Sequence, residues 1–188
     1  KIAVADCVCR KEAGLLGEGC TYPLETCLSF GAAAEFYIEN GFGREITVDE
    51  ALQILHDADD AGLVHAGANT KHLSNICNCC PCCCVSMKGM TQHGLGKQKY
   101  MNSLFISVVN QEKCIGCEAC VDRCPVNAIL VLEGIATVDR DKCLGCGVCA
   151  PFCIEEAISI KLREDREEAF DRMIELGQAI IEGKKKLN

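Results

Sequence analysis

Residues 114–125 read CIGCEACVDRCP, and residues 143–154 read CLGCGVCAPFCI. Each stretch spaces its four cysteines as Cys-x2-Cys-x2-Cys-x3-Cys, and the second begins 29 residues after the first. Iron–sulfur clusters are held by thiolates, and in this arrangement three cysteines of a run hold one [4Fe–4S] cluster while the fourth ligates the cluster of the other run. The spacing therefore predicts two [4Fe–4S] clusters and a role in electron transfer.

The two cysteine runs form an internal repeat. Lys113 and Lys142 precede the first cysteine of each run, and Gly116 and Gly145 stand at equivalent places inside it. Because glycine has no Cβ, we expect these glycines to let the backbone approach a cluster closely. A short apolar segment precedes each run and another follows it, which predicts small hairpins beside the cluster loops. The apolar segments are residues 105–109, 129–132, 135–138 and 158–162.

With eight cysteines in register, residues 101–163 resemble a bacterial-type two-cluster ferredoxin domain. The resemblance implies an α+β, ferredoxin-like fold with pseudo-twofold symmetry. One departure is visible, because Ile154 follows the second run where Pro125 follows the first; proline is not a ligand, so the departure concerns loop shape. The resemblance also implies the ligands, which are Cys114, Cys117, Cys120 and Cys153 for one cluster and Cys143, Cys146, Cys149 and Cys124 for the other.

Zinc and disulfides are the alternative interpretations of these eight cysteines. A structural zinc site uses paired Cys-x2-Cys, but a third cysteine at the same interval and a fourth after x3 are surplus for tetrahedral Zn²⁺. The 18 cysteines in 188 residues approach the density of a secreted disulfide scaffold. A chain of this length with ordinary apolar content needs no such stapling, and the adjacent cysteines at 82–84 suit metal better than disulfides.

The charge and hydropathy of the chain exclude several function classes. A formal net charge of −8, to which each cluster adds negative charge, disfavours nucleic acid and favours redox partner proteins with basic docking faces. No apolar run approaches the roughly 20 residues that span a bilayer, and the start shows no basic-then-apolar signal pattern. We therefore expect no membrane span and a soluble, cytoplasmic protein. The chain begins at Lys1 rather than Met, so targeting information upstream remains open.

Ten more cysteines lie in residues 1–100, a region that we expect to be loop-rich with short helices. Six fall within residues 77–84, which read CNCCPCCC, an odd composition for a packed core that favours metal or cluster ligation. We expect the ten to form a pool for one or two further Fe–S clusters, with the four cysteines before residue 30 grouped on a third cluster. Arg10 is expected to be exposed, with neutralisation of cluster charge as the alternative. The ten are Cys7, Cys9, Cys20, Cys27, Cys77, Cys79, Cys80, Cys82, Cys83 and Cys84.

Helix signals occur on both sides of the repeat. Thr47 and Glu50 form a capping box that predicts a helix over residues 49–61 ended by Gly62. Residues 24–40 are ambiguous, and we favour a short strand followed by a helix that stops at the next glycine. Residues 164–188 have apolar side chains at helical spacing and predict an amphipathic helix. We expect this helix to pack on the ferredoxin-like body, with docking of a partner subunit as the alternative.

Further sequence patterns extend over most of the chain. They are residues 7–10 (CVCR), 19–31 (GCTYPLETCLSFG), 43–46 (GREI), 62–64 (GLV) and the cysteine-dense patch before the repeat. Taken together, these patterns resemble a family of anaerobic bacterial and archaeal 4Fe–4S dicluster-domain proteins. The resemblance implies a multi-cluster electron carrier or an oxidoreductase subunit, and longer members carry an additional N-terminal helical segment. Pro81 and Val85 depart from the family pattern, which has glycine at both places, and this affects the geometry of the extra site.

Three function classes follow from these observations. The first is electron transfer between a donor and a catalytic partner, either as a carrier or as a relay subunit of a larger anaerobic redox complex. The second is an enzyme or activase whose N-terminal cluster has an open iron site. The third is a redox sensor with a fused upstream segment. No Ser-His-Asp order, phosphate-binding glycine loop or dinucleotide fingerprint is present, so the chain is not expected to be an enzyme by itself.

Overall fold

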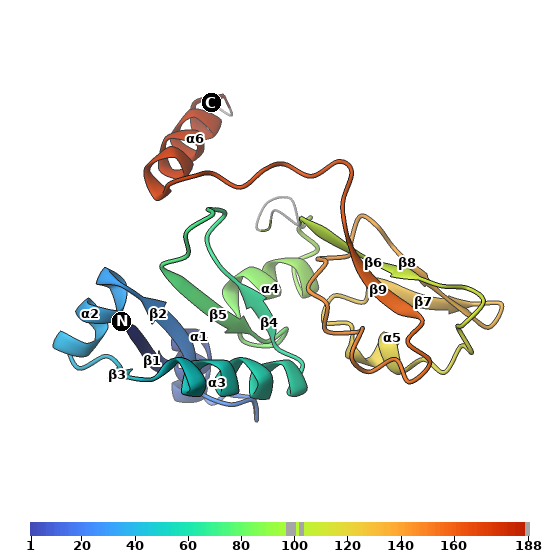
Figure 1. Cartoon of the computed structure of the whole chain (residues 1–188), viewed down its shortest axis with the longest axis horizontal. Coiled ribbons are helices and arrows are strands. Elements are labelled where there is room, and N and C mark those ends of the chain that lie inside the picture. Colours follow the sequence, from blue (N-terminus) through green and yellow to red (C-terminus); the bar gives the residue numbers. More distant parts are fainter. Residues whose placement is uncertain (97–100, 102–103, 187–188) are drawn as a thin grey trace.

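The N-terminal module (residues 1–96) is built on a five-stranded antiparallel sheet with the order β3-β1-β2-β5-β4. The structure is a computed structural model that describes residues 1–96, 101 and 104–186 (Figure 1). Val4 and Leu28, from two neighbouring strands of this sheet, pack in one core cluster with Ala51 of the helix Val48–Asp60. The strands are β1 (Ile2–Asp6), β2 (Glu25–Phe30), β3 (Arg44–Glu45), β4 (Val64–Ala66) and β5 (Asn75–Cys79).

Four helices belong to this module: α1 (Val8–Leu15), α2 (Ala32–Glu39), α3 (Val48–Asp60) and α4 (Val85–Thr91). The Thr47 hydroxyl oxygen accepts a hydrogen bond from the Glu50 N–H at 3.2 Å, which caps α3 as the capping box predicts. Gly62 follows with φ of +84°, a conformation that favours glycine and ends the helix. The strand-then-helix expectation for residues 24–40 is likewise confirmed by β2 and α2.

The sheet corrects the expectation of a loop-rich N-terminal region. Strand β1 spans only five residues, and β5 has the sequence NICNC, in which asparagine is a weak strand former. Neither strand alternates between apolar and polar residues in the way that marks a half-buried strand in a sequence. Strand β5 is held by its pairing with β2 on one side and β4 on the other.

The repeat module (residues 104–163) contains four strands, which match the four predicted apolar segments, and one short helix, α5 (Ala119–Arg123). Strands β7 and β8 form the expected hairpin, whereas β6 pairs with β9 from the far end of the module. The expectation of small hairpins beside the cluster loops therefore holds for β7 and β8, whereas β6 and β9 pair as strands distant in sequence and not as a hairpin. The strands are β6 (Phe105–Val109), β7 (Ile129–Leu132), β8 (Ile135–Val138) and β9 (Ile158–Leu162).

The C-terminal helix α6 (Met173–Lys186) begins later than predicted. Residues 164–172 instead form a link that returns to the N-terminal module, where the Phe170 N–H donates to the Asn69 carbonyl at 3.1 Å. Helix α6 consequently lies on the side of the N-terminal module and not on the repeat module (Figure 1), which corrects the expected packing. Residues 187–188 of the predicted helix, and residues 97–100 and 102–103 near the predicted domain boundary, lie outside the described residues.

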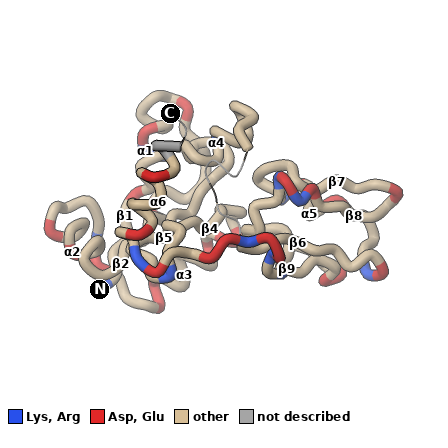
Figure 2. Tube along the Cα trace, turned by 90° about the horizontal axis from the view of Figure 1, so that it is seen from above, with Lys and Arg blue, Asp and Glu red and all other residues tan. Residues whose placement is uncertain are grey.

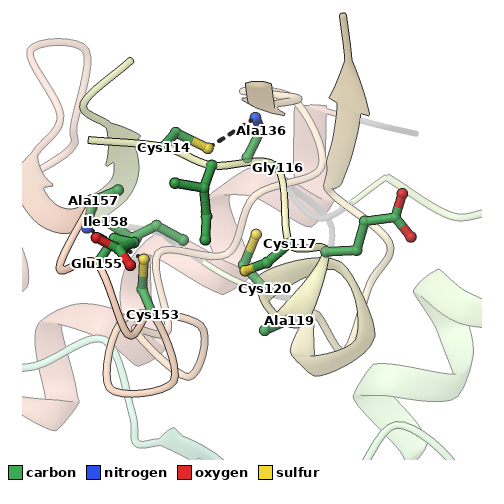
Figure 3. Close-up of a pocket in the computed structure, with 12 residues that line it drawn as sticks. Cys114, Gly116, Cys117, Ala119, Cys120, Ala136, Cys153, Glu155, Ala157 and Ile158 are labelled. Atoms are coloured by element: carbon green, nitrogen blue, oxygen red, sulfur yellow. Dashed lines mark hydrogen bonds between the residues drawn. The ribbon is translucent and has the colours of Figure 1, made fainter. Parts of the chain in front are cut away.

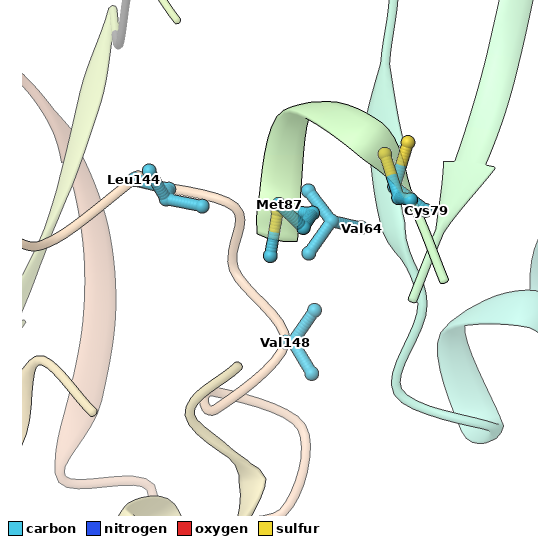
Figure 4. Packing of buried hydrophobic residues seen from close by; sticks show 6 residues of the cluster. Val64, Cys79, Met87, Leu144 and Val148 are labelled. Carbon is cyan, nitrogen blue, oxygen red and sulfur yellow. The ribbon is translucent and has the colours of Figure 1, made fainter. Parts of the chain in front are cut away.

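The two modules share one packed cluster (Figure 4). Met87 of α4 is fully buried and packs with Val64 of β4 against Leu144 and Val148 of the repeat module. A polar contact lies nearby, because the Arg123 guanidinium donates to the carbonyls of residues 59 and 60 at 3.1 and 2.9 Å. These contacts place the repeat module against the cysteine-rich end of the N-terminal module. None of the described helices is long and apolar enough to cross a membrane.

Candidate metal and cluster sites

Four thiols of the repeat module line one pocket, which Figure 3 shows: Cys114, Cys117, Cys120 and Cys153. The last of them comes from the second cysteine run, so the structure brings the crossing cysteine next to three cysteines of the first run. Two backbone amides point at these sulfurs. The Ala136 N–H donates to the Cys114 Sγ at 3.3 Å, and the Ala157 N–H donates to the Cys153 Sγ at 3.2 Å.

The other four cysteines of the repeat are Cys124, Cys143, Cys146 and Cys149, and they also lie close together. Burial, followed by the nearby thiols of the other three, raises the pKa of Cys146 to about 12. The Ala128 N–H donates to the Cys124 Sγ at 3.1 Å, and the Gly145 N–H donates to the Cys143 Sγ at 3.4 Å. Thiols crowded in this way repel each other once ionised, so a cation or a metal cluster is needed to hold them as thiolates.

The chemistry of both groups fits a [4Fe–4S] cluster. Each offers four thiols, the ligand type and number that such a cluster takes. Each also receives backbone N–H donors on its sulfurs, which are the outer contacts that stabilise negative thiolate ligands. Residues Ala128 and Ala157 occupy equivalent positions, 29 residues apart, and make equivalent hydrogen bonds to Cys124 and Cys153.

The two repeat glycines serve the packing of the loops on neighbouring strands. Gly116 has φ of +67°, and a Cβ there would lie 2.4 Å from the Gly134 carbonyl oxygen. Gly145 has φ of +64°, and a Cβ there would lie 2.1 Å from the Phe105 carbonyl oxygen. The predicted need for glycine therefore has a different cause from the one expected. The close approach is between the loop and a strand backbone.

The ten N-terminal cysteines separate into two groups. The first, called here the tetrathiol site, consists of Cys20, Cys80, Cys82 and Cys83, whose four Sγ atoms lie within 4.8 Å of one another. Cys20 is therefore not grouped with the other three cysteines before residue 30, which corrects the expected division. The reason is topological, because the connection after α1 carries Cys20 to the turn between β5 and α4.

The second group, called here the six-thiol cavity, surrounds a space of about 940 Å³. Its walls come from both modules, because Leu144 and Cys146 of the repeat module line it together with residues of β4, β5 and the link before α6. Leu176 of α6 also lines this cavity. The six N-terminal thiols are Cys7, Cys9, Cys27, Cys77, Cys79 and Cys84.

The thiols of this cavity form a hydrogen-bonded set. The thiols of Cys27 and Cys79 donate to the Cys77 sulfur and lower the pKa of Cys77 to about 3. Their own pKa values are raised in turn, with the bond to Cys77 as the largest cause. Cys79 also bonds to Cys84 and lowers the pKa of Cys84 to about 6. Cys77 and Cys84 are therefore the thiols of this set whose pKa values are lowered, which favours their thiolates, the form that binds metal.

Arg10 is a buried cation between the two N-terminal groups, contrary to the expectation that it is exposed. Its side chain is 4% exposed and donates to the Asn78 carbonyl at 2.9 Å and to the Thr26 hydroxyl. It lies within hydrogen-bonding reach of Cys80 and within electrostatic range of Cys77. A buried guanidinium needs a negative partner, and the thiolates of these two cysteines supply one.

Two polar residues of the sites were missed by reasoning from the sequence. Ser107 is buried, and its hydroxyl oxygen lies 3.4 Å from the Cys149 Sγ. A comparison of the two repeats points to this residue, because the first repeat has a serine at position 107 where the second has Ala136. Arg123 carried no such signal, since its contacts with α3 depend on how the modules dock.

One family model matches the chain, that of the 4Fe-4S binding domain, at residues 107–130 and 136–159. No curated protein matches the chain. The two adjacent matches coincide with the two repeats that carry the eight cysteines in register. They support a 4Fe-4S ferredoxin-type domain over residues 107–159 and, with it, an iron–sulfur electron-transfer role.

Proposed function

We propose that this chain is a multi-cluster iron–sulfur electron-transfer protein that relays electrons between redox partner proteins, as a carrier or as a subunit of a larger complex. Two [4Fe–4S] clusters occupy the two four-thiol groups of the repeat module, related by pseudo-twofold symmetry. One further Fe–S cluster occupies the six-thiol cavity. When bound, such clusters supply one-electron transfer. The chain places the three sites side by side, so that electrons can pass from one cluster to the next.

The observation that carries the proposal is the position of Cys146. This residue belongs to the second four-thiol group of the repeat and also lines the six-thiol cavity. A centre in the cavity therefore lies directly beside a centre in the repeat module. Leu144 and Val148, on either side of Cys146, are packed against Val64 and Met87, so the contact that joins the two centres is part of a buried interface.

The opposite end of the relay lies at the first four-thiol group. Cys117 is exposed, and the neighbouring Ile115 is 61% exposed. A partner protein can approach the cluster there without displacing buried residues. Acidic groups of the chain favour a partner with a basic docking face.

Iron content tests the proposal on anaerobically purified protein. Three clusters predict about twelve irons per chain, four for each [4Fe–4S] cluster. Replacing Cys27, Cys77 and Cys79 by serine leaves three cavity thiols, fewer than the usual four ligands, so iron is expected to fall by about four. The signal of interacting clusters in electron paramagnetic resonance is expected to simplify in the same variant. A wild-type chain with about eight irons, unchanged in the variant, would contradict the cluster in the cavity while leaving the repeat clusters in place.

The size of the six-thiol cavity favours one second candidate, an enzyme or activase with an open iron site. The volume of about 940 Å³ leaves space for a small molecule beside a cluster. An open coordination position is the feature that distinguishes catalytic from structural metals. Addition of cyanide or carbon monoxide to the reduced protein separates the two functions, because only an open iron site changes its resonance spectrum.

A further inference from the structure

The spacing of sulfur atoms in the tetrathiol site is that of a single metal ion. All four Sγ atoms lie within 4.8 Å of one another, and those of Cys82 and Cys83 are 3.9 Å apart. A tetrahedral ion with metal–sulfur bonds of about 2.3 Å places its sulfurs about 3.8 Å from each other. A [4Fe–4S] cluster binds each thiolate through a different iron, so its cysteine sulfurs lie farther apart than those on one ion.

We propose that the tetrathiol site binds one thiophilic divalent ion, Zn²⁺ or Fe²⁺, in a closed tetrahedral site separate from the Fe–S clusters. Four protein ligands leave no open coordination position, which is the arrangement of structural metal sites. The site does not depend on the function proposed above, because its four thiols take no part in the six-thiol cavity or in the repeat module.

The surroundings of the tetrathiol site suit a bound ion. Cys80 and Cys83 are buried and pack with Ala58 and Leu63 in one apolar cluster, so the site excludes water on that side. The Cys83 N–H donates to the Cys80 Sγ at 3.4 Å, a contact that stabilises a thiolate ligand. Arg10 lies within hydrogen-bonding reach of the Cys80 sulfur and offsets the excess negative charge of four thiolates around one divalent ion.

A metal ion here ties two otherwise irregular connections together. Cys20 lies in the segment between α1 and β2, which has no regular structure over residues 16–24. The other three ligands lie in the turn between β5 and α4. The ion would therefore join parts of the chain about 60 residues apart and act as a cross-link, in the way that structural zinc supplies folding energy to small modules.

Adjacent cysteines provide a matched pair of variants. Cys83→Ser removes a ligand of the tetrathiol site, whereas Cys84→Ser removes a thiol of the six-thiol cavity. Zinc, iron and sulfide are measured on the full chain, purified anaerobically from medium that contains both metals. We expect Cys83→Ser to lose about one metal ion per chain with the sulfide unchanged. Cys84→Ser is expected to retain that ion.

Two spectroscopic measurements on the wild-type chain identify the ion and need no variant. If it is zinc, X-ray absorption at the zinc edge is expected to show four sulfurs at about 2.3 Å. If it is iron, Mössbauer spectroscopy is expected to show one high-spin tetrathiolate iron in addition to the clusters. The proposal is overturned if Cys83→Ser loses about four irons together with sulfide, as loss of a cluster requires. It is also overturned if neither measurement detects a tetrathiolate ion in the wild-type chain.

Discussion

Ser107 distinguishes the two four-thiol groups of the repeat module. Its hydroxyl lies 3.4 Å from the Cys149 Sγ and 3.8 Å from the Cys143 Sγ. The equivalent position beside the first group is Ala136, which offers only its backbone N–H, to Cys114. A donor on a ligand sulfur stabilises the more negative, reduced state of a cluster. We therefore expect the cluster beside Ser107 to have the higher reduction potential, other contacts being equal.

Ser107→Ala is expected to lower the potential of that cluster by roughly 40 mV, because one hydrogen bond contributes about 1 kcal/mol and the couple transfers one electron. A redox titration followed by electron paramagnetic resonance measures the shift. The reciprocal variant Ala136→Ser introduces a hydroxyl at the equivalent position of the other half and is expected to raise the potential of the other cluster. Equal potentials in wild type and both variants would mean that the hydroxyl does not donate to a ligand sulfur.

The candidate ligands differ in how far the sequence predicts their grouping. The eight repeat cysteines follow from a spacing whose chemistry is specific, and the structure gathers them into two groups of four. The grouping of Cys20 with residues 80–83 depends on where the loop after α1 folds, which no local pattern encodes. The burial of Arg10 has the same origin, because its partners Asn78 and Thr26 come from β5 and β2.

Among the elements, α3 and α5 form the polar contact between the modules. The Arg123 guanidinium of α5 donates to the last carbonyls of α3 and lies 3.5 Å from the centre of the Phe152 ring. A cation at the C-terminal end of a helix satisfies carbonyls that lack a partner in the helix and also interacts favourably with the helix dipole. Gly62 lies under this side chain, since a Cβ there would be 3.3 Å from the guanidinium carbon.

Arg123→Ala is expected to weaken this contact by about 2 kcal/mol, because it removes hydrogen bonds from a charged group and a cation–π contact. Hydrogen exchange on the holoprotein measures the effect, with faster exchange expected at the backbone amides of residues 61–63. Lys142→Ala is the control, since it removes a cation of the same module whose partner is the exposed Asp139 at 3.6 Å. Equal exchange in both variants would show that Arg123 does not hold the modules together.

Elements with strong local signals were predicted, and those held by distant contacts were not. The capping box of α3 and the apolar segments of the repeat each involve only a few neighbouring residues. The helix and the strands that they predict are present in the structure. The start of α6 was placed too early because residues 164–172 continue its composition. That segment instead pairs with the N-terminal module through the bridge between Thr70 and Phe170 and the ion pair of Lys71 with Asp171 at 2.6 Å.

At the scale of the whole molecule, the docking of the two modules decides whether the chain holds separate centres or a relay. This arrangement was not predictable, because Met87 and Val148 belong to no periodic pattern, although both are almost completely buried between the modules. The pairing of β6 with β9 keeps the ends of the repeat together. The link from β9 to the N-terminal module then provides a second connection between the modules (Figure 1).

The electrostatic field of the molecule predicts how its electron-transfer rates respond to salt. The chain has 27 acidic and 19 basic residues, and the acidic positions are spread over both modules (Figure 2). Such a field speeds the encounter with cations and slows that with anions, and about 0.1 M salt screens it beyond roughly 10 Å. Oxidation of the reduced protein by a cationic cobalt(III) ammine is therefore expected to slow as salt increases. Oxidation by ferricyanide is expected to accelerate.

Stopped-flow absorbance measures both rates over the same salt series, and each acceptor serves as the control for the other. The expected slopes have opposite signs because only the charge product of the two reactants changes sign. Parallel slopes would show that salt acts on the protein itself and not on the encounter. A cobalt ammine rate that rises with salt would place the electron exit in a basic surface and would contradict a partner with a basic docking face.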